Sequence, residues 1–368
     1  MNIFYDHQIF SIQNQGGISR YFYELISRFN TVDEKFISSI VLTNNEYLKT
    51  SPINLSSTFF PNHHFRGKFR LMNTLNKMNS LKILQKSKFD IFHPTYYDPY
   101  FFSKLGDRPF VLTVHDLINE KFIDKFCYLE QEEELTKAKH EMMLRAEKII
   151  AISENTKKDI IDFYKINPSK IEVIYLGNSI SGYSKGHSKL LNYDYVLFVG
   201  KREMYKNFNF VMETVGQLLI QNNLKFVCFG GGEFTIEEMK LIIRLGLKDH
   251  VLFVNYNDDA SLKNLYTNAL FFIFPSMYEG FGLPLLEAFA CDCPVLSSSG
   301  GSLQEIGGDA AIYFNPYDSQ SLYISFLEMV QSDQVRNNCI EKGRLREKEF
   351  SWNKTFDETI NVYKSVLE

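Results

Sequence analysis

Short apolar segments alternate with longer helical segments along almost the whole chain, and this alternation constrains the fold more than any other feature. The predicted strands are residues 2–5, 38–43, 90–93, 109–114, 148–152 and 171–176, followed by 195–199, 225–229, 251–254, 270–274, 294–297 and 311–314. Strands that are apolar throughout and separated by helices are typical of parallel sheets covered by helices on both faces. The alternation therefore predicts an α/β fold.

A polar, glycine-bearing segment, 178–194, interrupts the alternation near the middle of the chain and is typical of an interdomain linker. The length of 368 residues also exceeds what one ordinary hydrophobic core accommodates. We therefore expect two similar α/β domains, residues 1–180 and 181–350, with a ligand-binding cleft between them.

Composition excludes several classes of protein. A formal net charge of −4 gives no basic signature of nucleic-acid binding. The five cysteines are odd in number and lie mostly in apolar segments, which favours reduced thiols in a cytoplasm. The N-terminus lacks the basic start and apolar core of a signal peptide, and no apolar run reaches about 18 residues, so we expect neither a leader nor a membrane-spanning helix.

Two carboxylates, Glu279 and Glu287, stand eight positions apart around a glycine-bracketed turn. Glu279 follows the predicted strand 270–274, and open α/β sheets bind ligands at the carboxyl ends of their strands. Pro284 suits the start of a helix, so the backbone N–H groups of residues 280–283 would form an anion site at a helix N-terminus. An anion site beside two acids suits a ligand with both phosphate and sugar hydroxyls, and a nucleotide sugar is the simplest such ligand.

Two further features follow strands of the first half. Gly16 and Gly17 let the backbone approach a phosphate closely, although a plain turn is the alternative. His115 follows the strand 109–114 and can donate to a substrate hydroxyl or present its carbonyl to a developing cation. The alternative is that Asp116 caps the next helix and His115 is merely packed.

A basic loop follows the first strand of the second half. Lys201, Arg202 and Lys206 lie within six residues. Arginine as a bidentate fork and lysine as a point charge suit a diphosphate, whereas a solvated basic loop is the alternative.

Two short pairs could be mistaken for metal sites. Cys291 and Cys293 are too close together for a zinc knuckle and are expected to pack at a helix end. Asp258 and Asp259 are expected to start a helix. We therefore predict no metal and no cofactor.

Residues 65–89 combine basic and apolar side chains and contain no acidic residue. The basic residues are Arg66, Lys68, Arg70, Lys77, Lys82, Lys86 and Lys88, and the apolar residues at helical spacing are Leu71, Leu75, Met78, Leu81 and Leu84. Such a helix can lie on an anionic membrane surface, or its apolar stripe can face the core of the domain. The sequence leaves both interpretations open.

Together these residues resemble the retaining GT-B glycosyltransferases of glycosyltransferase family 4, over nearly the whole chain. The most specific motif is Glu279-x7-Glu287 within Tyr-Glu-Gly-Phe-Gly-Leu-Pro-Leu-Leu-Glu-Ala. The glycine pair, His115, the segment 151–156, the loop 200–207 and a final helix around Trp352 occur in the order of the family.

The resemblance implies two Rossmann-like domains, with a C-terminal helix, 351–368, that returns to the first domain. It also implies transfer of a sugar from GDP-mannose or a UDP or dTDP sugar to a glycan or lipid-linked saccharide, with retention of configuration, in bacterial surface polysaccharide assembly. The enzyme would be cytoplasmic, with a possible peripheral contact between 65–89 and the membrane. A nucleotide-sugar epimerase or hydrolase of the same architecture is the alternative.

Residue roles also follow from the resemblance. Glu279, with the backbone of Phe281, Gly282 and Leu283 beside it, would contact the sugar, and His115 would contact the reacting face of the sugar. Arg202 and Lys206 would bind the diphosphate, with Gly16 and Gly17 on its other side. Glu287 would bind the ribose, and Val254 to Tyr256 would contact the base. Many relatives carry arginine directly before the loop lysine, where this chain has Tyr205, so Arg202 would act from three residues earlier.

Overall fold

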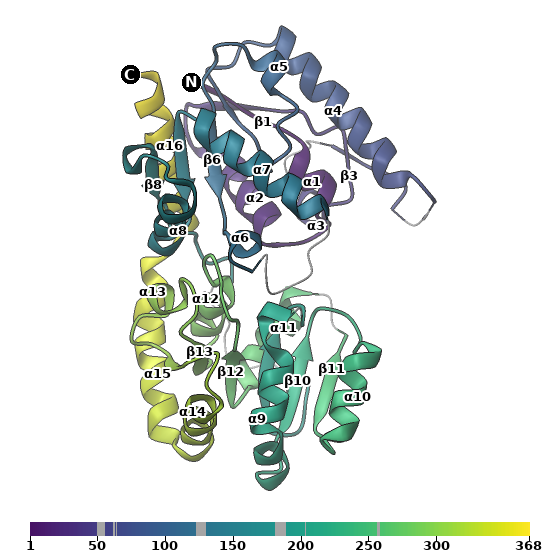
Figure 1. Ribbon diagram of the computed structural model, residues 1–368, viewed down its shortest axis with the longest axis vertical. Coiled ribbons are helices and arrows are strands. Elements are labelled where there is room, and N and C mark those ends of the chain that lie inside the picture. The colour runs from purple at the N-terminus through teal and green to yellow at the C-terminus, as the bar shows by residue number, and fades with distance from the viewer. Residues whose placement is uncertain are drawn as a thin grey trace. The chain divides into compact units, whose positions relative to one another are not determined.

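The computed structural model describes residues 1–49, 56–61, 63, 65–122, 130–180, 189–202, 204–255 and 258–368. The chain forms two compact units, the first made of Met1–Gly177 and Trp352–Glu368 and the second of Asn178–Ser351 (Figure 1). All strand pairs among the described residues are parallel. The predicted α/β class is confirmed, and so is the return of the C-terminal helix to the first unit.

The second unit contains one six-stranded sheet in the order β11-β10-β9-β12-β13-β14. Its strands are β9 (Tyr195–Val199), β10 (Lys225–Phe229), β11 (Val251–Val254), β12 (Phe271–Phe274), β13 (Val295–Ser298) and β14 (Ile312–Phe314). Its helices are η3 (Met204–Lys206), α9 (Phe208–Gln221), α10 (Ile236–Arg244), α11 (Asp259–Asn268), α12 (Leu283–Ala290), α13 (Leu303–Gly307), α14 (Ser319–Gln331), α15 (Asp333–Arg346) and η4 (Glu347–Glu349). Because β9 lies between β10 and β12, the loops that follow β9 and β12 leave the sheet in opposite directions and open a crevice at its carboxyl edge.

The first unit has two three-stranded sheets, β2-β1-β5 and β6-β7-β8, linked by a parallel bridge between Phe92 and Phe110. The strands are β1 (Asn2–Tyr5), β2 (Lys35–Ser38), β5 (Ile91–His93), β6 (Val111–Val114), β7 (Lys148–Ala151) and β8 (Ile171–Val173), with β3 (Leu42–Thr43) and β4 (Ser57–Thr58) forming a separate pair. The helices are α1 (Gln8–Ile12), α2 (Gly17–Arg28), η1 (Phe29–Thr31), α3 (Glu46–Lys49), α4 (Lys68–Lys86), α5 (Phe102–Leu105), α6 (Ile118–Phe122), α7 (Glu130–Arg145), α8 (Glu154–Tyr164), η2 (Pro168–Lys170) and α16 (Trp352–Leu367). Here β1 lies between β2 and β5, so the loops after β1 and β5 flank the corresponding crevice.

The single strand predicted over 38–43 is wrong. The structure has β2, which ends at Ser38, and the separate short strand β3. The side-chain oxygen Oδ1 of Asn76 accepts the backbone N–H groups of both Val41 and Leu42 at 3.0 Å. These donors are therefore satisfied by a distant side chain instead of a neighbouring strand.

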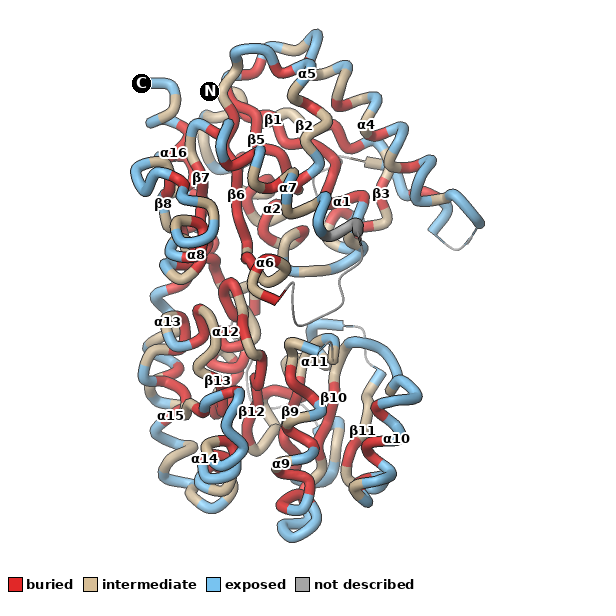
Figure 2. The backbone as a smooth tube through the Cα atoms, in the orientation of Figure 1, coloured by how far each residue is buried: buried red, intermediate tan, exposed pale blue. Residues whose placement is uncertain are grey.

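The strands form the buried centre of each unit (Figure 2). One apolar cluster joins the sheet of the second unit to α9 and α14, and another joins β5, β6 and β7 to α7 and α8 in the first. The four cysteines in the described residues, Cys228, Cys291, Cys293 and Cys339, are buried and free of disulfides. Within the described residues, no helix combines the length and apolarity that crossing a membrane requires.

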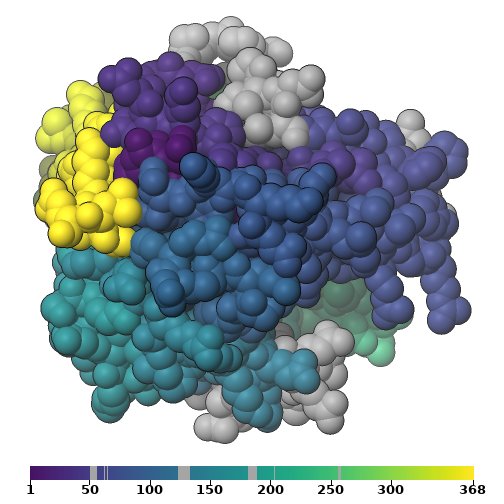
Figure 3. Space-filling view, turned by 90° about the horizontal axis from the view of Figure 1, so that it is seen from above, coloured from purple at the N-terminus to yellow at the C-terminus, as the bar shows by residue number. Residues whose placement is uncertain are grey.

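Buried hydrogen bonds fasten α16 to the first unit. The Tyr363 hydroxyl lies 2.7 Å from the Tyr5 hydroxyl and 2.6 Å from His93 Nδ1. His93 Nε2 in turn lies 2.9 Å from Thr113 Oγ1. Figure 3 shows the resulting contact between the C-terminal helix, in yellow, and the start of the chain, in purple. Side chains from β1, β5, β6 and the last helix, α16, thus share one polar network.

We predict that acid weakens this unit. Burial lowers the pKa of His93 and of His115 from 6.5 to about 3. Below pH 6.5 the unfolded chain therefore binds protons that the folded chain does not. The stability present above pH 6.5 is lost as the pH falls toward 3, by at most about 1.4 kcal/mol per pH unit for each histidine.

Urea unfolding at pH 7.5 and pH 5.5 measures this loss. His93→Gln should reduce the pH dependence of the unfolding free energy even though it lowers stability at both pH values. His63→Gln changes an exposed histidine and should leave the pH dependence as it is. An unchanged pH dependence in His93→Gln would contradict the prediction.

Candidate functional site

An ion pair occupies the crevice of the second unit. Lys206, in the loop after β9, donates from Nζ to Glu279 Oε1, in the loop after β12, at 2.6 Å. The two side chains are only 15% and 13% exposed. The backbone N–H of Met277 donates to the Tyr205 carbonyl at 2.7 Å, which ties the two loops together. Two residues that the sequence analysis placed in one ligand site are thus in direct contact.

Aromatic rings and a left-handed residue hold Lys206 in place. Its ammonium lies 5.1 Å from the centre of the Tyr205 ring and 5.3 Å from that of Phe274. Cations are attracted to the faces of such rings. Asn207 has a φ of 62° and donates from its side chain to the Pro316 carbonyl at 2.8 Å, so the chain turns sharply into α9. Tyr205 therefore supplies an aromatic face at the position where the resemblance led us to expect arginine.

The loop after β13 supports the Glu279 turn from behind. Ser302 donates to the Glu279 carbonyl from both its N–H, at 3.1 Å, and its hydroxyl, at 3.0 Å. A Cβ atom at Gly301 would lie 2.4 Å from that same carbonyl oxygen, and one at Gly300 would lie 2.2 Å from the Met277 carbonyl. The sequence analysis missed this pair, although a glycine pair directly after a strand next to β12 was a usable signal.

The turn then enters α12 as the sequence predicted. Gly282 has a φ of 112° and caps the helix, which begins at Leu283 with Pro284 in its first turn. Phe281 is buried and packs edge-on against Phe350. The first amides of α12 therefore lie beside Glu279 at the positive end of the helix.

Glu287 lies one turn further along α12 and has a different partner. Its Oε2 accepts a hydrogen bond from the Tyr266 hydroxyl of α11 at 3.2 Å. Burial, and then the charge of Glu287, raise the pKa of Tyr266 well above its ordinary value, so Tyr266 remains a donor. Its neutral hydroxyl orients the Glu287 carboxylate.

Arg202 was expected to bind the diphosphate, but its side chain is occupied by contacts within the protein. Its side chain is 2% exposed, and Nε donates to Glu238 Oε1 at 3.0 Å. Nη1 donates to the Gly230 carbonyl at 3.3 Å, and Nη2 donates to the carbonyls of Gly232 and Glu233, each at 2.8 Å. In this structure Arg202 holds the glycine turn after β10, while Lys206 presents its charge in the crevice.

The residues expected near a base are only partly described. Val254 is the last residue of β11, and Tyr256 lies outside the described residues. Asp258 caps α11 by accepting the N–H and the hydroxyl of Ser261, each at 2.7 Å. The prediction that this acidic pair starts a helix is confirmed.

In the first unit, Gly16 and Gly17 stand at the start of α2. Gln13 Oε1 accepts the Ser19 N–H at 3.2 Å and would lie 2.6 Å from a Cβ atom at Gly16. A Cβ atom at Gly16 would therefore displace only the end of the flexible Gln13 side chain, which caps the helix.

His115 lies at the end of β6 with its ring buried. Its Nε2 has no hydrogen-bond partner among the described residues. Burial, and then the charge of Lys139, lower its pKa to about 3, so the ring is neutral. Lys139 donates to the Asp116 carbonyl at 3.1 Å, and the Ile118 N–H donates to Asp116 Oδ1 at 3.2 Å. The capping role of Asp116 is thus present, but an orphaned buried nitrogen is uncommon and indicates that a ligand group can bind there.

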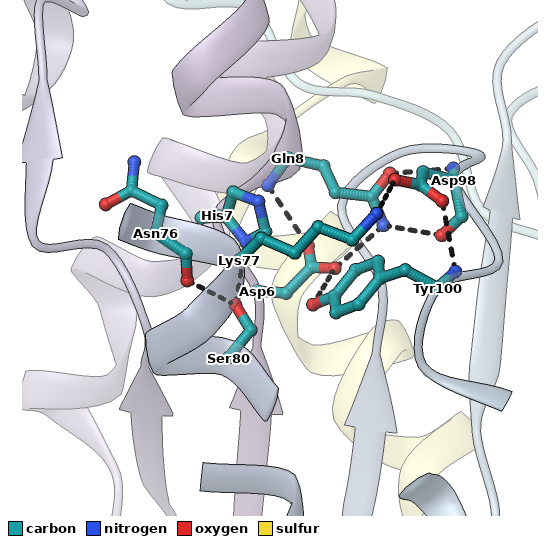
Figure 4. A network of polar contacts seen from close by, with 8 residues as sticks. All are labelled: Asp6, His7, Gln8, Asn76, Lys77, Ser80, Asp98 and Tyr100. Carbon is teal, nitrogen blue, oxygen red and sulfur yellow. Dashed lines mark hydrogen bonds and ion pairs between the residues drawn. The ribbon is translucent and has the colours of Figure 1, made fainter. Parts of the chain in front are cut away.

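A polar network that the sequence analysis did not identify joins the loops after β1 and β5 (Figure 4). Asp6 Oδ1 accepts the Thr95 N–H at 2.9 Å and its hydroxyl at 2.7 Å. Asp6 Oδ2 accepts from Gln8 Nε2 at 2.8 Å and from the Tyr100 hydroxyl at 3.0 Å. The Gln8 N–H also donates to Oδ1 at 3.3 Å, so Oδ1 has three donors and Oδ2 has two, and the two loops are held together at the crevice of the first unit.

The same network holds α4. His7 Nδ1 lies 2.7 Å from the Ser80 hydroxyl, and Lys77 forms an ion pair with Asp98 at 2.9 Å (Figure 4). The ammonium of Lys77 also lies 5.0 Å from the centre of the Tyr100 ring. The position of α4 is therefore set by specific polar contacts.

Helix α4 differs from an ordinary surface helix because it buries polar side chains on one face and exposes apolar side chains on another. Its buried residues are spaced by four and include two polar ones, namely Met72, Asn76, Ser80 and Leu84. Leu71, Leu75 and Met78, which we call the outer stripe, are 47%, 41% and 63% exposed. The interpretation in which the apolar stripe faces the core is therefore wrong for the outer stripe, whereas Leu84 is buried and Leu81 packs against the core.

Comparison with known proteins identifies the family. Residues 183–346 match the model of "Glycosyl transferases group 1", and residues 15–180 match that of "Glycosyltransferase Family 4". O-antigen chain mannosyltransferase B of Escherichia coli is 28% identical over 66% of this chain and 65% of its own length. The "N-acetylgalactosamine-N,N'-diacetylbacillosaminyl-diphospho-undecaprenol 4-alpha-N-acetylgalactosaminyltransferase" of Campylobacter jejuni is 27% identical over 56% of this chain and 57% of its own. The match thus spans less than two thirds of each of these relatives.

Solved structures share the fold over the full length of the chain. Sucrose-phosphate synthase of Thermosynechococcus elongatus superposes with a TM-score of 0.79 at 17% identity and covers 100% of this chain and 99% of its own. HepE of Anabaena, solved with UDP and glucose, gives a TM-score of 0.75 at 16% identity over 99% of this chain and 100% of its own. The fold is GT-B.

We predict that Gly301→Ala disturbs the Glu279 turn. Gly301 and Gly246 have similar positive φ angles, 63° and 71°, but only at Gly301 would a Cβ atom strike neighbouring backbone. Gly246→Ala should cost about 1 to 2 kcal/mol of unfolding free energy, which is the cost of a left-handed alanine. Gly301→Ala should cost more and should also shift the NMR signals of the Lys206 side chain. Equal costs and unchanged signals would contradict the role of Gly301.

Proposed function

Because the chain belongs to the group 1 glycosyl transferases of glycosyltransferase family 4, we propose that it transfers a sugar from a nucleotide diphosphate sugar to a glycan or lipid-linked saccharide. The observation that carries this proposal is the Lys206 and Glu279 ion pair in the crevice of the second unit. A cation for a diphosphate and a carboxylate for sugar hydroxyls are the two groups that such a donor needs side by side.

Donor binding would exchange the partners of this ion pair. The diphosphate takes the ammonium of Lys206, and the freed carboxylate of Glu279 accepts hydroxyl groups of the sugar. As the glycosidic bond breaks, negative charge grows on the leaving diphosphate and positive charge on the sugar ring. Lys206 and the first amides of α12 stabilise the former, and Glu279 offsets the latter.

We propose that configuration is retained without an enzyme nucleophile. The departing phosphate oxygen accepts the proton of the acceptor hydroxyl, whose oxygen forms the new bond on the same face of the sugar. The neutral ring of His115, with its orphaned Nε2, would contact the sugar near this face. No metal ion is required in this scheme, because Lys206 and the helix N-terminus supply the positive charge.

The remaining roles are proposals of the same kind. Glu287, oriented by Tyr266, would accept the ribose hydroxyls. The backbone at Gly16 and Gly17 would approach the diphosphate, and the segment from Val254 to Tyr256 would contact the base. Arg202, whose donors bind the glycine turn, would act on the diphosphate by fixing the loop that carries Lys206.

Relatives support a short list of donors and acceptors. The Escherichia coli relative is named as a mannosyltransferase of an O-antigen chain, which favours GDP-mannose and surface polysaccharide synthesis. The HepE structure contains UDP and glucose, which keeps a UDP sugar on the list, and a dTDP sugar remains the third candidate. A nucleotide-sugar epimerase or hydrolase is the second candidate function, since the crevice chemistry alone suits it equally.

The outer stripe of α4 supports a peripheral contact with the cytoplasmic face of a membrane. Leu71, Leu75 and Met78 share one side of the helix with Lys82, because spacings of three and four residues return to the same face. Exposed apolar side chains next to a cation fit the surface of an anionic bilayer. Such a contact would bring the first unit to a lipid-linked acceptor.

Donor turnover tests the proposed function. The protein is incubated in turn with GDP-mannose, UDP-glucose and a dTDP sugar, and nucleotide should be released rapidly only when a saccharide acceptor is present. This release should continue in the presence of EDTA. The product should have the same anomeric configuration as the donor sugar, as read from its anomeric proton. Acceptor-independent release at the same rate would indicate a hydrolase or epimerase, and an inverted product would refute retention.

In the same assay the two glutamates should behave differently. Glu279→Gln should lower kcat by about a hundredfold, because its contact strengthens in the transition state. Glu287→Gln should raise KM for the donor by about tenfold with little change in kcat, because a ribose contact is the same before and during reaction. Glu237→Gln, an exposed glutamate of α10, is the control. Reversal of the two effects would exchange the assigned roles.

The membrane contact predicts a measurable binding change. The affinity for vesicles of anionic lipid, measured by co-sedimentation, should fall by about thirtyfold when Leu75 and Met78 are both replaced by Gln, because about 2 kcal/mol of apolar burial is lost. Replacing Ile236 and Ile243, which are similarly exposed on α10 of the second unit, is the matched control. If both pairs have the same effect, α4 is not the membrane surface.

A further inference from the structure

A pocket of about 660 Å³ lies in the first unit between the end of α1 and the start of α4. Its lining combines cations, amides and apolar side chains, namely Ser11, Ile12, Asn14, Asn44, Phe65, Arg66, Gly67, Lys68, Phe69, Arg70 and Met72. No acidic residue is among the described residues that line it. A volume of this size is in the usual range for small-molecule sites.

Two of the three cations in the pocket are available to a ligand. Lys68 donates from Nζ to the carbonyls of Phe60, at 2.7 Å, and His63, at 3.1 Å, so its charge holds the preceding loop. Arg66 and Arg70 have no hydrogen bond or ion pair with any other residue that the structure describes. Two guanidinium groups beside one pocket suit an anion with several oxygens, such as a diphosphate.

The rim of the pocket is apolar. Phe65 and Phe69 are 44% and 52% exposed, and Ile12 on the opposite side is 48% exposed. A purely ionic ligand such as inorganic phosphate would contact the arginines but would leave the neighbouring aromatic side chains exposed to solvent. They fit an anion that carries a hydrocarbon group.

The pocket adjoins the glycine pair and has a rigid wall. Asn14 precedes Gly16 by two residues, and its carbonyl accepts the Glu46 N–H at 2.8 Å. On the side of α4, Asn76 donates from Nδ2 to the Ser11 hydroxyl at 2.9 Å and to the Leu42 carbonyl at 2.7 Å. The helix that carries Arg70 is thus fixed by hydrogen bonds to the helix that carries Ser11, and these two helices form the two sides of the pocket.

We propose that this pocket binds the diphosphate of a polyprenyl diphosphate-linked acceptor, with Arg66 and Arg70 on the phosphate oxygens and Phe65 and Phe69 on the first isoprene units. This inference rests on the proposed function, which it deepens by specifying the acceptor class. The Campylobacter jejuni relative is named for a diphospho-undecaprenol substrate, and the pocket supplies a chemical reason why such a group would be recognised here. The exposed outer stripe begins at Leu71, directly after Arg70, so exposed apolar side chains lie on the same helix as the pocket.

Titration calorimetry with farnesyl diphosphate tests the pocket. The full chain carries Lys206→Met in every variant, so that the diphosphate does not bind at the proposed donor site. Arg66→Gln with Arg70→Gln should weaken binding by about tenfold for each arginine removed. Lys86→Gln with Lys88→Gln removes two exposed cations at the far end of α4 and should leave binding unchanged. Equal weakening by both pairs would show general charge attraction and would overturn the site.

Two further ligands separate the parts of the proposal. Farnesol lacks the phosphates and inorganic pyrophosphate lacks the hydrocarbon, so each should bind at least about tenfold more weakly than farnesyl diphosphate. Inorganic pyrophosphate that binds as tightly as farnesyl diphosphate would make the pocket a free-phosphate site and refute the lipid assignment.

Turnover distinguishes this proposal from the proposed function. With wild-type Lys206, the Arg66→Gln and Arg70→Gln pair should raise KM for a polyprenyl diphosphate-linked acceptor by at least tenfold and leave KM for the donor unchanged. If the chain turns over no donor at all, the proposed function fails while the binding result still stands. If transfer occurs and the arginine pair changes neither binding nor acceptor KM, only the pocket proposal fails.

Discussion

The position of β9 between β10 and β12 is the constraint on which the second unit depends. Loops that leave neighbouring strands in opposite directions cannot cover the carboxyl edge between them, so a crevice remains there. Lys206 comes from one of these loops and Glu279 from the other, and their ion pair joins the two loops at this edge. Because both charges are largely removed from water, a ligand that replaces each partner with a better one is required to separate them. The proposed chemistry follows from that exchange.

Backbone packing determines how well this ion pair is positioned. Gly300 and Gly301 allow the loop after β13 to lie directly against the Glu279 turn, where any larger residue would strike a carbonyl oxygen. Arg202 does the same for the other loop, since its donors hold the turn after β10 against it. Neither Gly301 nor Arg202 needs to touch a ligand to matter. Both restrict the conformations of the loops that do.

The first unit uses buried polar groups in place of apolar ones where specificity of position matters. Asp6, Asn76 and Ser80 lie inside with several hydrogen bonds each, while the outer stripe of α4 is left in solvent. A buried polar group is tolerated only when its bonds are made, so such a helix has one acceptable position. Buried hydrogen bonds therefore fix the position of α4 on the first unit, even though the helix leaves apolar side chains in solvent and lines a basic pocket.

The sequence by itself determined most of the strands, the α/β class and the turn that leads from Glu279 into α12. The predicted ranges of β9, β10 and β11 agree with the structure because each is a continuous apolar run bounded by polar residues, a signal that is local. What only the tertiary structure decided are the partners of polar side chains. Asn76 ends the strand predicted over 38–43 from 34 residues away, and Arg202 binds carbonyls that follow another strand. Helix α4 buries Asn76 and Ser80 while it exposes the outer stripe. Each of these outcomes depends on which donors and acceptors the fold brings within about 3 Å of one another, and a hydrogen bond has no period along the chain from which it could be predicted.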